Sequence, residues 1–173
     1  MIETAPGHPA RQLSFGPLSL GGASFGNLYR EVSDAQVQQA LEAAWAGGIR
    51  SFDTAPHYGL GLSERRLGRF LAQFPREEYV LSTKVGRLLE PRENPTGARD
   101  EAGGFAVPAD WERVFDPSEA GVRRSLEDSL ERLGLDRVDV LYLHDPDVYD
   151  LDRGLAEGLP ALATLREEGL VRA

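Results

Sequence analysis

Val138-Asp139-Val140-Leu141-Tyr142-Leu143 is a short, mostly apolar run that ends at a polar residue, His144. The same arrangement occurs twice earlier in the chain, where Ile49-Arg50-Ser51-Phe52 leads into Asp53 and Tyr79-Val80-Leu81-Ser82-Thr83 leads into Lys84. Short runs of this kind are typical of strands in a parallel sheet that is covered on both faces. Because the carboxyl ends of parallel strands share one face, we expect the three polar side chains to converge there.

Segments with apolar residues at helical spacing alternate with these runs. The expected helical stripes are Val37, Leu41, Ala44 and Trp45; Leu67, Phe70, Leu71 and Phe74; Val122, Leu126, Leu130 and Leu133; and Leu155, Leu159, Leu162 and Leu165. Ser33 and Ser63 are expected to cap the first two helices, and residues 116–118 to open the third. Gly47-Gly48 and Gly134 supply stop signals for the first and third helices.

A strand followed by a helix is thus repeated four times, which predicts an α/β fold built on a parallel sheet. The first strand is assigned to Leu18 to Gly21, and Gly16-Pro17 is expected to join it to Gln12 to Phe15 in a small hairpin. Residues 1–10 are expected to be a tail, and residues 11–173 to form one domain.

The composition excludes several classes of partner. Lys and Arg number 19 against 28 Asp and Glu, so the formal charge is 19 − 28 = −9, and no basic field would attract nucleic acid or an anionic membrane. The absence of cysteine excludes disulfides and thiolate metal sites, and it suits a reducing compartment. The sequence has neither a signal-peptide pattern at its start nor an apolar run of the roughly 20 residues that span a bilayer, so we expect a cytoplasmic protein.

The polar strand ends, together with a nearby tyrosine, form a set suited to moving a proton. Tyr58 follows the second strand in a glycine-containing loop. A phenol has a pKa of about 10 and becomes a useful acid at neutral pH when its anion is stabilised. The ammonium of Lys84 can stabilise that anion, and the carboxylate of Asp53 can hold the ammonium in place. His144 can donate a hydrogen bond to a substrate oxygen.

Each residue also has a structural interpretation. Asp53 can form a turn, Tyr58 can pack in its loop, and His144 can cap a strand, whereas a buried Lys84 requires a partner. Two other chemistries use the same residues: a Schiff-base lyase through Lys84, and a metal site from His57, His144 and Asp53. The lyase leaves Asp53 and Tyr58 unexplained, and the metal site lacks the helix-spaced histidine pair that would support it.

The segment between Lys84 and Asp116 is long and has no clean periodicity. It contains Pro91, Pro95 and Pro108 and several glycines. A loop of this length in a globular domain is usually functional or disordered. Since it leaves the sheet on the side of the polar residues, we interpret it as a substrate lid, with a disordered insertion as the alternative.

Several motifs resemble those of the aldo-keto reductases. The first is Ser51-Phe52-Asp53-Thr54-Ala55-Pro56-His57-Tyr58-Gly59, with Ser63-Glu64 and Leu67-Gly68 after it. The second is Leu81-Ser82-Thr83-Lys84-Val85-Gly86, and the third runs from Leu133-Gly134-Leu135-Asp136 to His144. The resemblance extends from about Ser19 to the end of the sequence, and its combined motifs are highly specific.

The resemblance implies a parallel (β/α) TIM-barrel type of fold, NAD(P) as hydride carrier, and a small carbonyl or sugar substrate. It also implies a catalytic tetrad of Asp53, Tyr58, Lys84 and His144, in which Tyr58 is the general acid or base and His144 orients the carbonyl. Asp53 would in addition contact the cofactor. The His144-Asp145-Pro146-Asp147 motif and the long segment after Lys84 are similar to the branch that oxidises free aldoses such as fucose or galactose.

The chain departs from this family in length. A complete barrel has eight strand-helix units and about 250 residues, whereas this sequence supplies about the first four units and reaches the fifth strand at Leu170-Val171. The family's later segments, which hold the cofactor, are not among these units, so we expect little dehydrogenase activity from the chain alone. The alternative function is a non-catalytic half-barrel or pseudoenzyme that acts as an assembly module, and open sheet edges would allow a homodimer.

Overall fold

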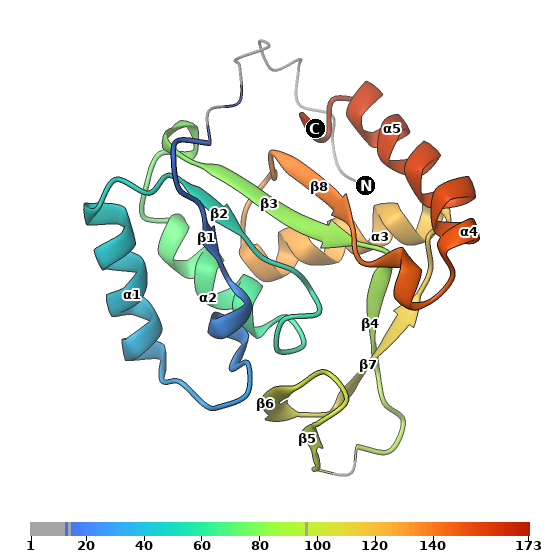
Figure 1. Ribbon diagram of the computed structural model, residues 1–173, viewed down its shortest axis with the longest axis horizontal. Coiled ribbons are helices and arrows are strands. Elements are labelled where there is room, and N and C mark those ends of the chain that lie inside the picture. The colour runs from blue at the N-terminus through green and yellow to red at the C-terminus, as the bar shows by residue number, and fades with distance from the viewer. Residues whose placement is uncertain (1–12, 14, 96) are drawn as a thin grey trace.

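Four parallel strands form the central sheet of the computed structural model, which describes residues 13, 15–95 and 97–173 (Figure 1). They are β1 (Leu20–Gly21), β2 (Ser51–Asp53), β3 (Val80–Val85) and β8 (Val140–Leu143), in the order β1-β2-β3-β8. The predicted parallel α/β arrangement is therefore confirmed.

The start of the chain differs from the prediction. The expected tail, residues 1–10, lies outside the described residues, as do Gln12 and Ser14 of the expected hairpin. The described residues 13 and 15–19 belong to no strand, so the first strand begins two residues later than predicted.

Four helices pack on one face of the sheet: α1 (Asp34–Ala46), α2 (Leu62–Leu71), α3 (Glu119–Leu133) and α5 (Leu159–Glu167) (Figure 1). Shorter helical segments are η1 (Ala23–Gly26), η2 (Arg76–Glu78), η3 (Pro146–Val148), α4 (Leu151–Arg153) and the π-helical η4 (Gly154–Gly158). The helices share one apolar core with the strand residues Phe52, Leu81 and Leu141.

Side chains alternate along the strands, so residues next to this core point to the other face. Phe52 lies in the core, whereas the next residue, Asp53, accepts a hydrogen bond from the Ser82 hydroxyl of β3 at 2.7 Å. Leu81 and Val85 likewise face the helices, with Lys84 between them on the opposite face. The strands therefore separate a helix-facing apolar layer from a polar face that carries the predicted site residues.

Of the two serines predicted to cap helices, Ser33 does so and Ser63 does not, and Ser118, among the residues expected to open the third helix, caps α3. Ser33 forms a capping box with Gln36, and the Ser118 hydroxyl accepts the Gly121 N–H at 3.1 Å. Ser63 does not cap α2, because the helix begins after Gly61 and includes Ser63 in its first turn. Its hydroxyl donates to the Gly22 carbonyl at 2.7 Å instead, which ties α2 to the end of β1.

The predicted stripe of the last helix is wrong at its first two positions. Leu155 and Leu159 are 50% and 48% exposed, whereas Ala161 and Leu165 are buried. The π-helical turn of η4 inserts an extra residue and shifts the helical register. It brings Gly158 against Leu143, where a Cβ would lie 2.7 Å from the leucine Cδ2.

The expected lid is neither an irregular loop nor disordered in its described residues. β4 (Arg87–Pro91) pairs antiparallel with β7 (Trp111–Phe115), and β5 (Arg99–Asp100) pairs antiparallel with β6 (Phe105–Pro108). Phe105 and Val107 of β6 form a second apolar cluster with Leu89 of β4 and Leu60 of the loop after β2. The two ribbons therefore rest on the loop that contains Tyr58.

The segment predicted to begin a fifth strand lies beside β8. The Arg172 N–H donates to the Asp139 carbonyl at 2.9 Å, and the Leu141 N–H donates to the Ala173 carbonyl at 2.9 Å. Asp139 also accepts hydrogen bonds from Arg76 at 2.6 Å and from the Leu81 N–H at 2.9 Å. These contacts anchor the segment at the β8 edge of the sheet.

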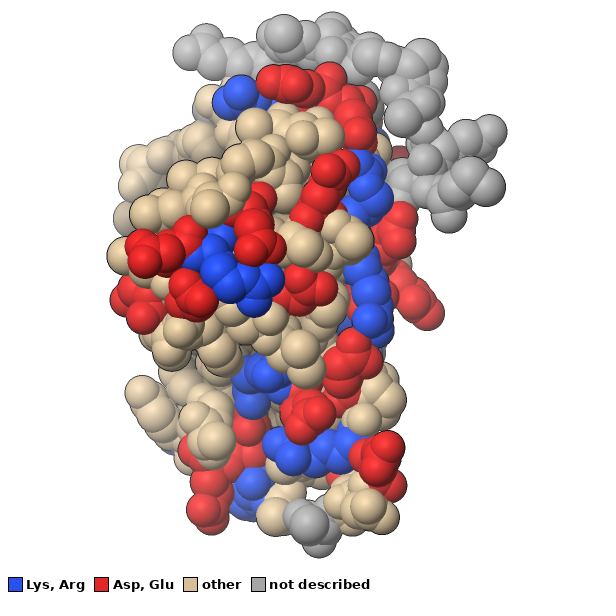
Figure 2. Space-filling model, turned by 90° about the vertical axis from the view of Figure 1, so that its right-hand side faces the viewer, with Lys and Arg blue, Asp and Glu red and all other residues tan. Residues whose placement is uncertain are grey.

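Charges of both signs are mixed on the surface. On the face in Figure 2, Lys and Arg are interspersed with Asp and Glu. Surface pairs such as Arg123 with Glu168 and Arg153 with Glu157 have N–O distances of 2.9 Å. No helix among the described residues is both long and apolar enough to cross a membrane.

One ion pair is buried between α2, α3 and β3. The Glu64 side chain is 0% exposed, and its carboxylate accepts hydrogen bonds from Arg132 at 2.6 Å and from the Thr83 hydroxyl at 2.8 Å. Removing one partner of such a pair leaves an uncompensated buried charge, which typically costs about 3–5 kcal/mol.

We therefore expect Arg132→Met to lower the free energy of unfolding by about 3 kcal/mol or more, as measured by urea denaturation. Arg153→Met is the matched control, because it breaks an ion pair on the surface and should change stability little. Equal losses in the two variants would show that the buried pair does not support the packing of α2 against α3.

Candidate active site

Three of the four predicted site residues lie where parallel strands end. Asp53 is the last residue of β2, Lys84 is the penultimate residue of β3, and His144 directly follows β8. β2 and β3 pair with Asp53 opposite Ser82, and β3 and β8 pair with Val85 opposite Leu143. This register brings the three strand ends to one edge of the sheet, as predicted.

Lys84 and Asp53 form a tight, half-buried ion pair. The ammonium donates to Asp53 Oδ2 at 2.6 Å and to the Thr54 carbonyl at 3.0 Å. The Lys84 side chain is 15% exposed and that of Asp53 29%. The carboxylate thus supplies the partner that a lysine at the end of a buried strand requires.

Close backbone packing fixes the loop that carries Tyr58. Gly59 has a φ of +62°, and a Cβ there would lie 2.2 Å from the Gly26 carbonyl oxygen. A Cβ on Gly26 would in turn lie 2.5 Å from the Tyr58 carbonyl carbon. Both positions therefore need glycine, since a larger side chain would push Tyr58 away from η1.

Tyr58 meets the ion pair through the face of its ring. Lys84 Nζ lies 4.7 Å from the ring centroid, within the range of a cation–π interaction. Among the described residues, the Tyr58 hydroxyl forms no hydrogen bond with Lys84 or Asp53. The expected hydrogen-bonded cluster of Tyr58, Lys84 and Asp53 is therefore present only as the Asp53–Lys84 hydrogen bond, and Tyr58 meets the ammonium with the face of its ring instead of its hydroxyl.

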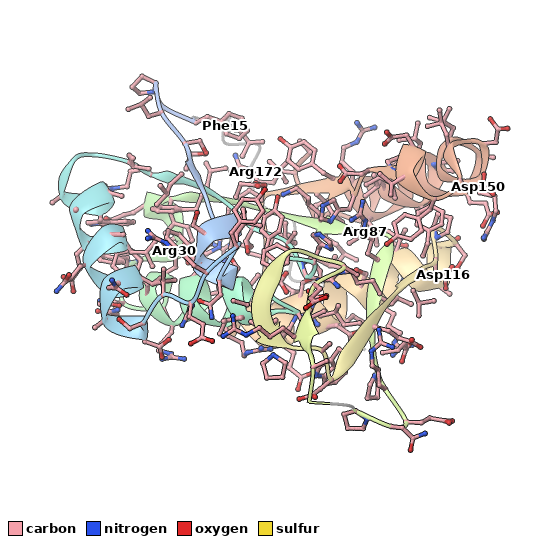
Figure 3. All side chains as sticks on the ribbon, turned by 60° about the horizontal axis from the view of Figure 1, so that its bottom comes forward. Phe15, Arg30, Arg87, Asp116, Asp150 and Arg172 are labelled. Carbon is pink, nitrogen blue, oxygen red and sulfur yellow. The ribbon has the colours of Figure 1, made fainter. Side chains whose placement is uncertain are left out.

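His144 completes the cluster. Its ring is 5.9 Å from the Tyr58 ring and nearly perpendicular to it, and its side chain is 5% exposed. The backbone N–H of His144 donates to the Val85 carbonyl at 3.0 Å, and the Arg87 guanidinium donates to the His144 carbonyl at 3.2 Å. Arg87 also pairs with Asp145 at 3.0 Å, so it holds the turn after β8 (Figure 3).

Burial keeps the His144 ring neutral. Loss of hydration, helped by the nearby positive charge of Arg87, lowers the pKa of His144 to about 2. A neutral imidazole has one N–H donor and one acceptor nitrogen, so at neutral pH His144 can hydrogen-bond a substrate oxygen without acting as an acid. Its Nδ1 atom is buried and has no hydrogen-bond partner.

A second histidine, which the sequence interpretation weighed only as a metal ligand, joins the cluster. The ring of His57 lies 5.2 Å from the ring of His144 and 5.3 Å from that of Phe105. Its Nδ1 is also buried without a partner, and burial, with a smaller contribution from Arg113, lowers its pKa to about 4. The feature of the sequence that could have identified His57 as part of this cluster is its position immediately before Tyr58.

The ribbons reach the site through β6. The Phe105 ring lies 6.1 Å from the Tyr58 ring, so the segment interpreted as a substrate lid contacts the phenol directly. That this segment covers a bound substrate stays a prediction. Within the described part of the chain, no group of three acidic or histidine side chains is arranged to hold a metal ion.

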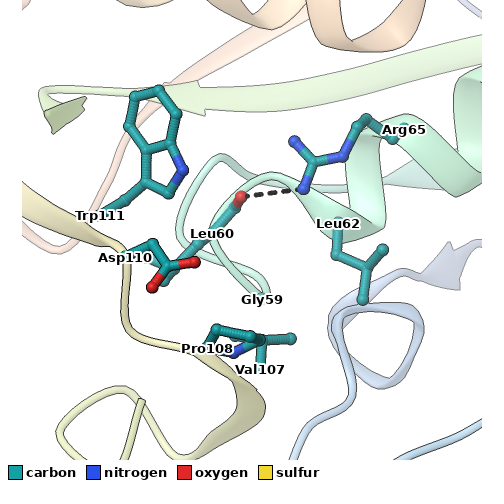
Figure 4. Close-up of a pocket in the computed structure, with 8 residues that line it drawn as sticks. All are labelled: Gly59, Leu60, Leu62, Arg65, Val107, Pro108, Asp110 and Trp111. Atoms are coloured by element: carbon teal, nitrogen blue, oxygen red, sulfur yellow. Dashed lines mark hydrogen bonds between the residues drawn. The ribbon is translucent and has the colours of Figure 1, made fainter. Parts of the chain in front are cut away.

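A separate pocket of about 200 Å³ lies between the end of the loop after β2, the start of α2 and the ribbons (Figure 4). Leu60, Val107 and Trp111 line it, and Arg65 crosses one end to donate to the Leu60 carbonyl at 3.3 Å. None of the four predicted catalytic residues lines this pocket, so it adjoins the backbone of the loop and not the side-chain cluster.

The side chains of this cluster can donate and accept protons. None of them can carry a hydride, so hydride transfer would require a cofactor. Asp53 can still accept a hydrogen bond from such a cofactor. Each of its carboxylate oxygens accepts one side-chain hydrogen bond, and the side chain is 29% exposed. A carboxylate with free lone pairs at a strand end fits a hydroxyl or amide N–H of a dinucleotide.

Comparisons with known proteins identify a family that the chain matches. The sequence signature described as the aldo/keto reductase family matches residues 17–173. A D-threo-aldose 1-dehydrogenase from Pseudomonas sp. is 53% identical over 175 residues, which cover 100% of this chain and 53% of the relative. A pyridoxal 4-dehydrogenase from Microbacterium luteolum is 43% identical over 74% of this chain and 39% of the relative.

Solved structures give the same result. The glycerol dehydrogenase of Gluconobacter oxydans matches with a TM-score of 0.68 and 27% identity, over 95% of this chain and 45% of that one. The resemblance that the motifs indicated is thus confirmed. The chain spans about half the length of the curated relatives that it matches.

The lowered histidine pKa values predict how stability depends on pH. In the unfolded chain both rings would take up protons below about pH 6.5, whereas folded His57 stays neutral down to about pH 4 and His144 to about pH 2. The folded state is therefore expected to keep this contribution to stability above pH 6.5 and to lose it as the pH falls towards 4.

NMR titration of the imidazole rings tests this directly, with urea midpoints between pH 4 and 8 as the second measurement. His57→Phe should flatten the pH dependence of the midpoint. A ring of His57 or His144 that titrates near pH 6.5 in the folded chain would contradict the buried, neutral arrangement.

Proposed function

The chain belongs to the aldo/keto reductase family, and we propose that it carries the proton-transfer machinery of an NAD(P)-dependent oxidoreductase acting on an aldose or a related small carbonyl compound. The observation that carries the proposal is the Asp53–Lys84 ion pair stacked against the ring of Tyr58, with a neutral imidazole beside it. The name of the aldose dehydrogenase relative supports the substrate class.

Tyr58 is the proposed general acid and base. In the oxidising direction, the phenolate oxygen takes the proton of the substrate hydroxyl as the C–H bond breaks and the C=O bond forms. In the reducing direction, the phenol returns that proton to the carbonyl oxygen. When bound, the nicotinamide accepts or supplies the hydride. Positioned acid–base catalysis of this kind contributes typically about 10²–10⁴-fold to the rate.

Lys84 and His144 have separate tasks in this proposal. The ammonium of Lys84 stabilises the negative charge that develops on Tyr58, and Asp53 holds the ammonium at 2.6 Å. The neutral His144 ring donates a hydrogen bond to the reacting oxygen, which orients the carbonyl. Asp53 would also help to hold the cofactor, through the lone pairs of its carboxylate that remain free.

The second candidate is a non-catalytic assembly module. Its supporting observation is the β1 edge of the sheet: among the described residues, β1 pairs with β2 on one side and with no strand on the other. An unpaired edge of this kind favours association, including a symmetric dimer. Light scattering with size-exclusion chromatography measures association, and an aldose assay with NAD or NADP measures activity.

Two preparations separate these candidates: the 173-residue chain, and a chimera in which it is followed by the remaining part of the Pseudomonas aldose dehydrogenase. An active chimera beside an inactive chain supports the oxidoreductase proposal and assigns the missing activity to the rest of the barrel. A folded chimera that binds NAD or NADP but oxidises no aldose would favour the assembly module.

Tyr58→Phe is expected to lower turnover in the active preparation by at least about 10²-fold, because the ring remains and only the transferable proton is lost. Cofactor binding, followed by fluorescence titration with NADH and NADPH, should change little. Tyr149→Phe is the control, since Tyr149 stacks on Phe115 outside the cluster. Near-normal turnover by the Tyr58 variant would exclude it as the acid.

A further inference from the structure

We propose that His57 is a substrate-contact residue that works beside His144 and selects carbonyl compounds with hydroxyl groups next to the reacting carbon. This inference rests on the proposed oxidoreductase function and names the substrate class of the same site. The ligand would be a cyclic aldose or another polyhydroxylated carbonyl compound, in preference to one with an apolar chain.

His57 lies beside both the proposed acid and the other imidazole of the cluster. His57 precedes the proposed acid, Tyr58, and its ring lies 5.2 Å from the ring of His144 in an edge-to-face arrangement. The Tyr58 ring is 6.2 Å from His57 and 5.9 Å from His144. The two imidazoles therefore lie on the same side of the phenol, within reach of one small molecule.

Both imidazole rings have a polar atom that no other group uses. The Nδ1 atoms of His57 and His144 are buried, and neither has a hydrogen-bond partner. Buried polar atoms normally have a hydrogen-bond partner. Two such nitrogens without one in the same cluster therefore mark a place where a bound molecule could supply the missing hydrogen bonds. The neighbours Phe105 and Tyr58 contact His57 through their rings and leave that nitrogen without a bond.

Two neutral imidazoles are chemically complementary to a substrate that carries a hydroxyl group beside its carbonyl. A reacting carbonyl oxygen only accepts hydrogen bonds, so the N–H of one imidazole is enough for it. A second neutral imidazole offers another donor and another acceptor, and a hydroxyl group can use both. His57 is therefore suited to a hydroxyl on a carbon close to the reacting one.

The ribbons hold His57 in this place. Arg113 of β7 donates to the His57 carbonyl at 3.0 Å and to Asp100 of β5 at 2.8 Å. The side chains of Arg113 and Asp100 are only 11% and 5% exposed. This buried pair joins the two ribbons to the backbone of His57, while Phe105 of β6 packs edge-on against its ring.

The competing interpretation is that His57 only packs against Phe105. A phenylalanine would then serve as well as the imidazole. His57→Phe keeps an aromatic ring at this position and removes both nitrogens, whereas His57→Asn keeps a donor and an acceptor without the ring. The pair of variants therefore separates packing from hydrogen bonding.

The test compares oxidation of D-arabinose with oxidation of 2-hydroxytetrahydropyran. It uses whichever of the two preparations, the 173-residue chain or the chimera, oxidises aldoses. The second compound has the ring and reacting hydroxyl of a pyranose but none of its other hydroxyls. His57→Phe is expected to lower kcat/KM for D-arabinose about tenfold, mainly through KM, and to change that for 2-hydroxytetrahydropyran less than about threefold. His57→Asn should recover part of the loss. Equal losses for the two compounds would overturn the inference.

A binding measurement keeps the test independent of turnover. The chain has three histidines, His8, His57 and His144, so their ring signals in NMR spectra can be assigned by single substitutions. D-arabinose should shift the His57 signal, and 2-hydroxytetrahydropyran at the same concentration should shift it much less. An unchanged His57 signal at saturating D-arabinose would overturn the inference. If the unsubstituted protein oxidised neither compound while D-arabinose still shifted the His57 signal, the result would instead count against the proposed function.

Discussion

The ion pair between Lys84 and Asp53 is the constraint on which the site depends. An ammonium that is only 15% exposed needs a carboxylate, and the parallel register of β2 and β3 brings Asp53 to the same polar face within 2.6 Å. The helix-facing residues on either side, Phe52 and Val85, are buried in the core and fix the direction of both side chains. The apolar packing on one face of the sheet thus orients the chemistry on the other.

The ribbons between β3 and α3 connect the rest of the site to this pair. They place Phe105 beside Tyr58 and His57, and their buried Arg113–Asp100 pair binds the His57 carbonyl. Two separate layers therefore hold the tyrosine loop: the Gly26–Gly59 contact beneath it and the ribbons above it. A loop fixed from both sides keeps a catalytic side chain in place at little conformational cost when substrate binds.

The sequence predicted the features that local patterns encode. The four-stranded parallel sheet, the helix α1 with its serine cap, the helix α3, and the meeting of Asp53 with Lys84 all follow from apolar runs, capping signals and the need to pair a buried charge. It could not predict the two ribbons, because their strands lack the nearly unbroken apolar run that marks the buried strands: Glu90 and Pro91 end β4, and Glu112 and Arg113 lie within β7. The place of His57 depends on those ribbons, and the π-helical turn that exposes Leu155 depends on the contact of Gly158 with Leu143.

The central claim is that Lys84 acts through Tyr58. A double-variant cycle tests this most directly, with single-turnover hydride transfer measured in the active preparation for the wild type, Tyr58→Phe, Lys84→Met and the double variant. Residues that act as one unit give losses that are far from additive, so we expect the double variant to be about as slow as the slower single variant. Losses that multiply in the double variant would contradict the account, because Lys84 would then contribute to hydride transfer independently of the phenol.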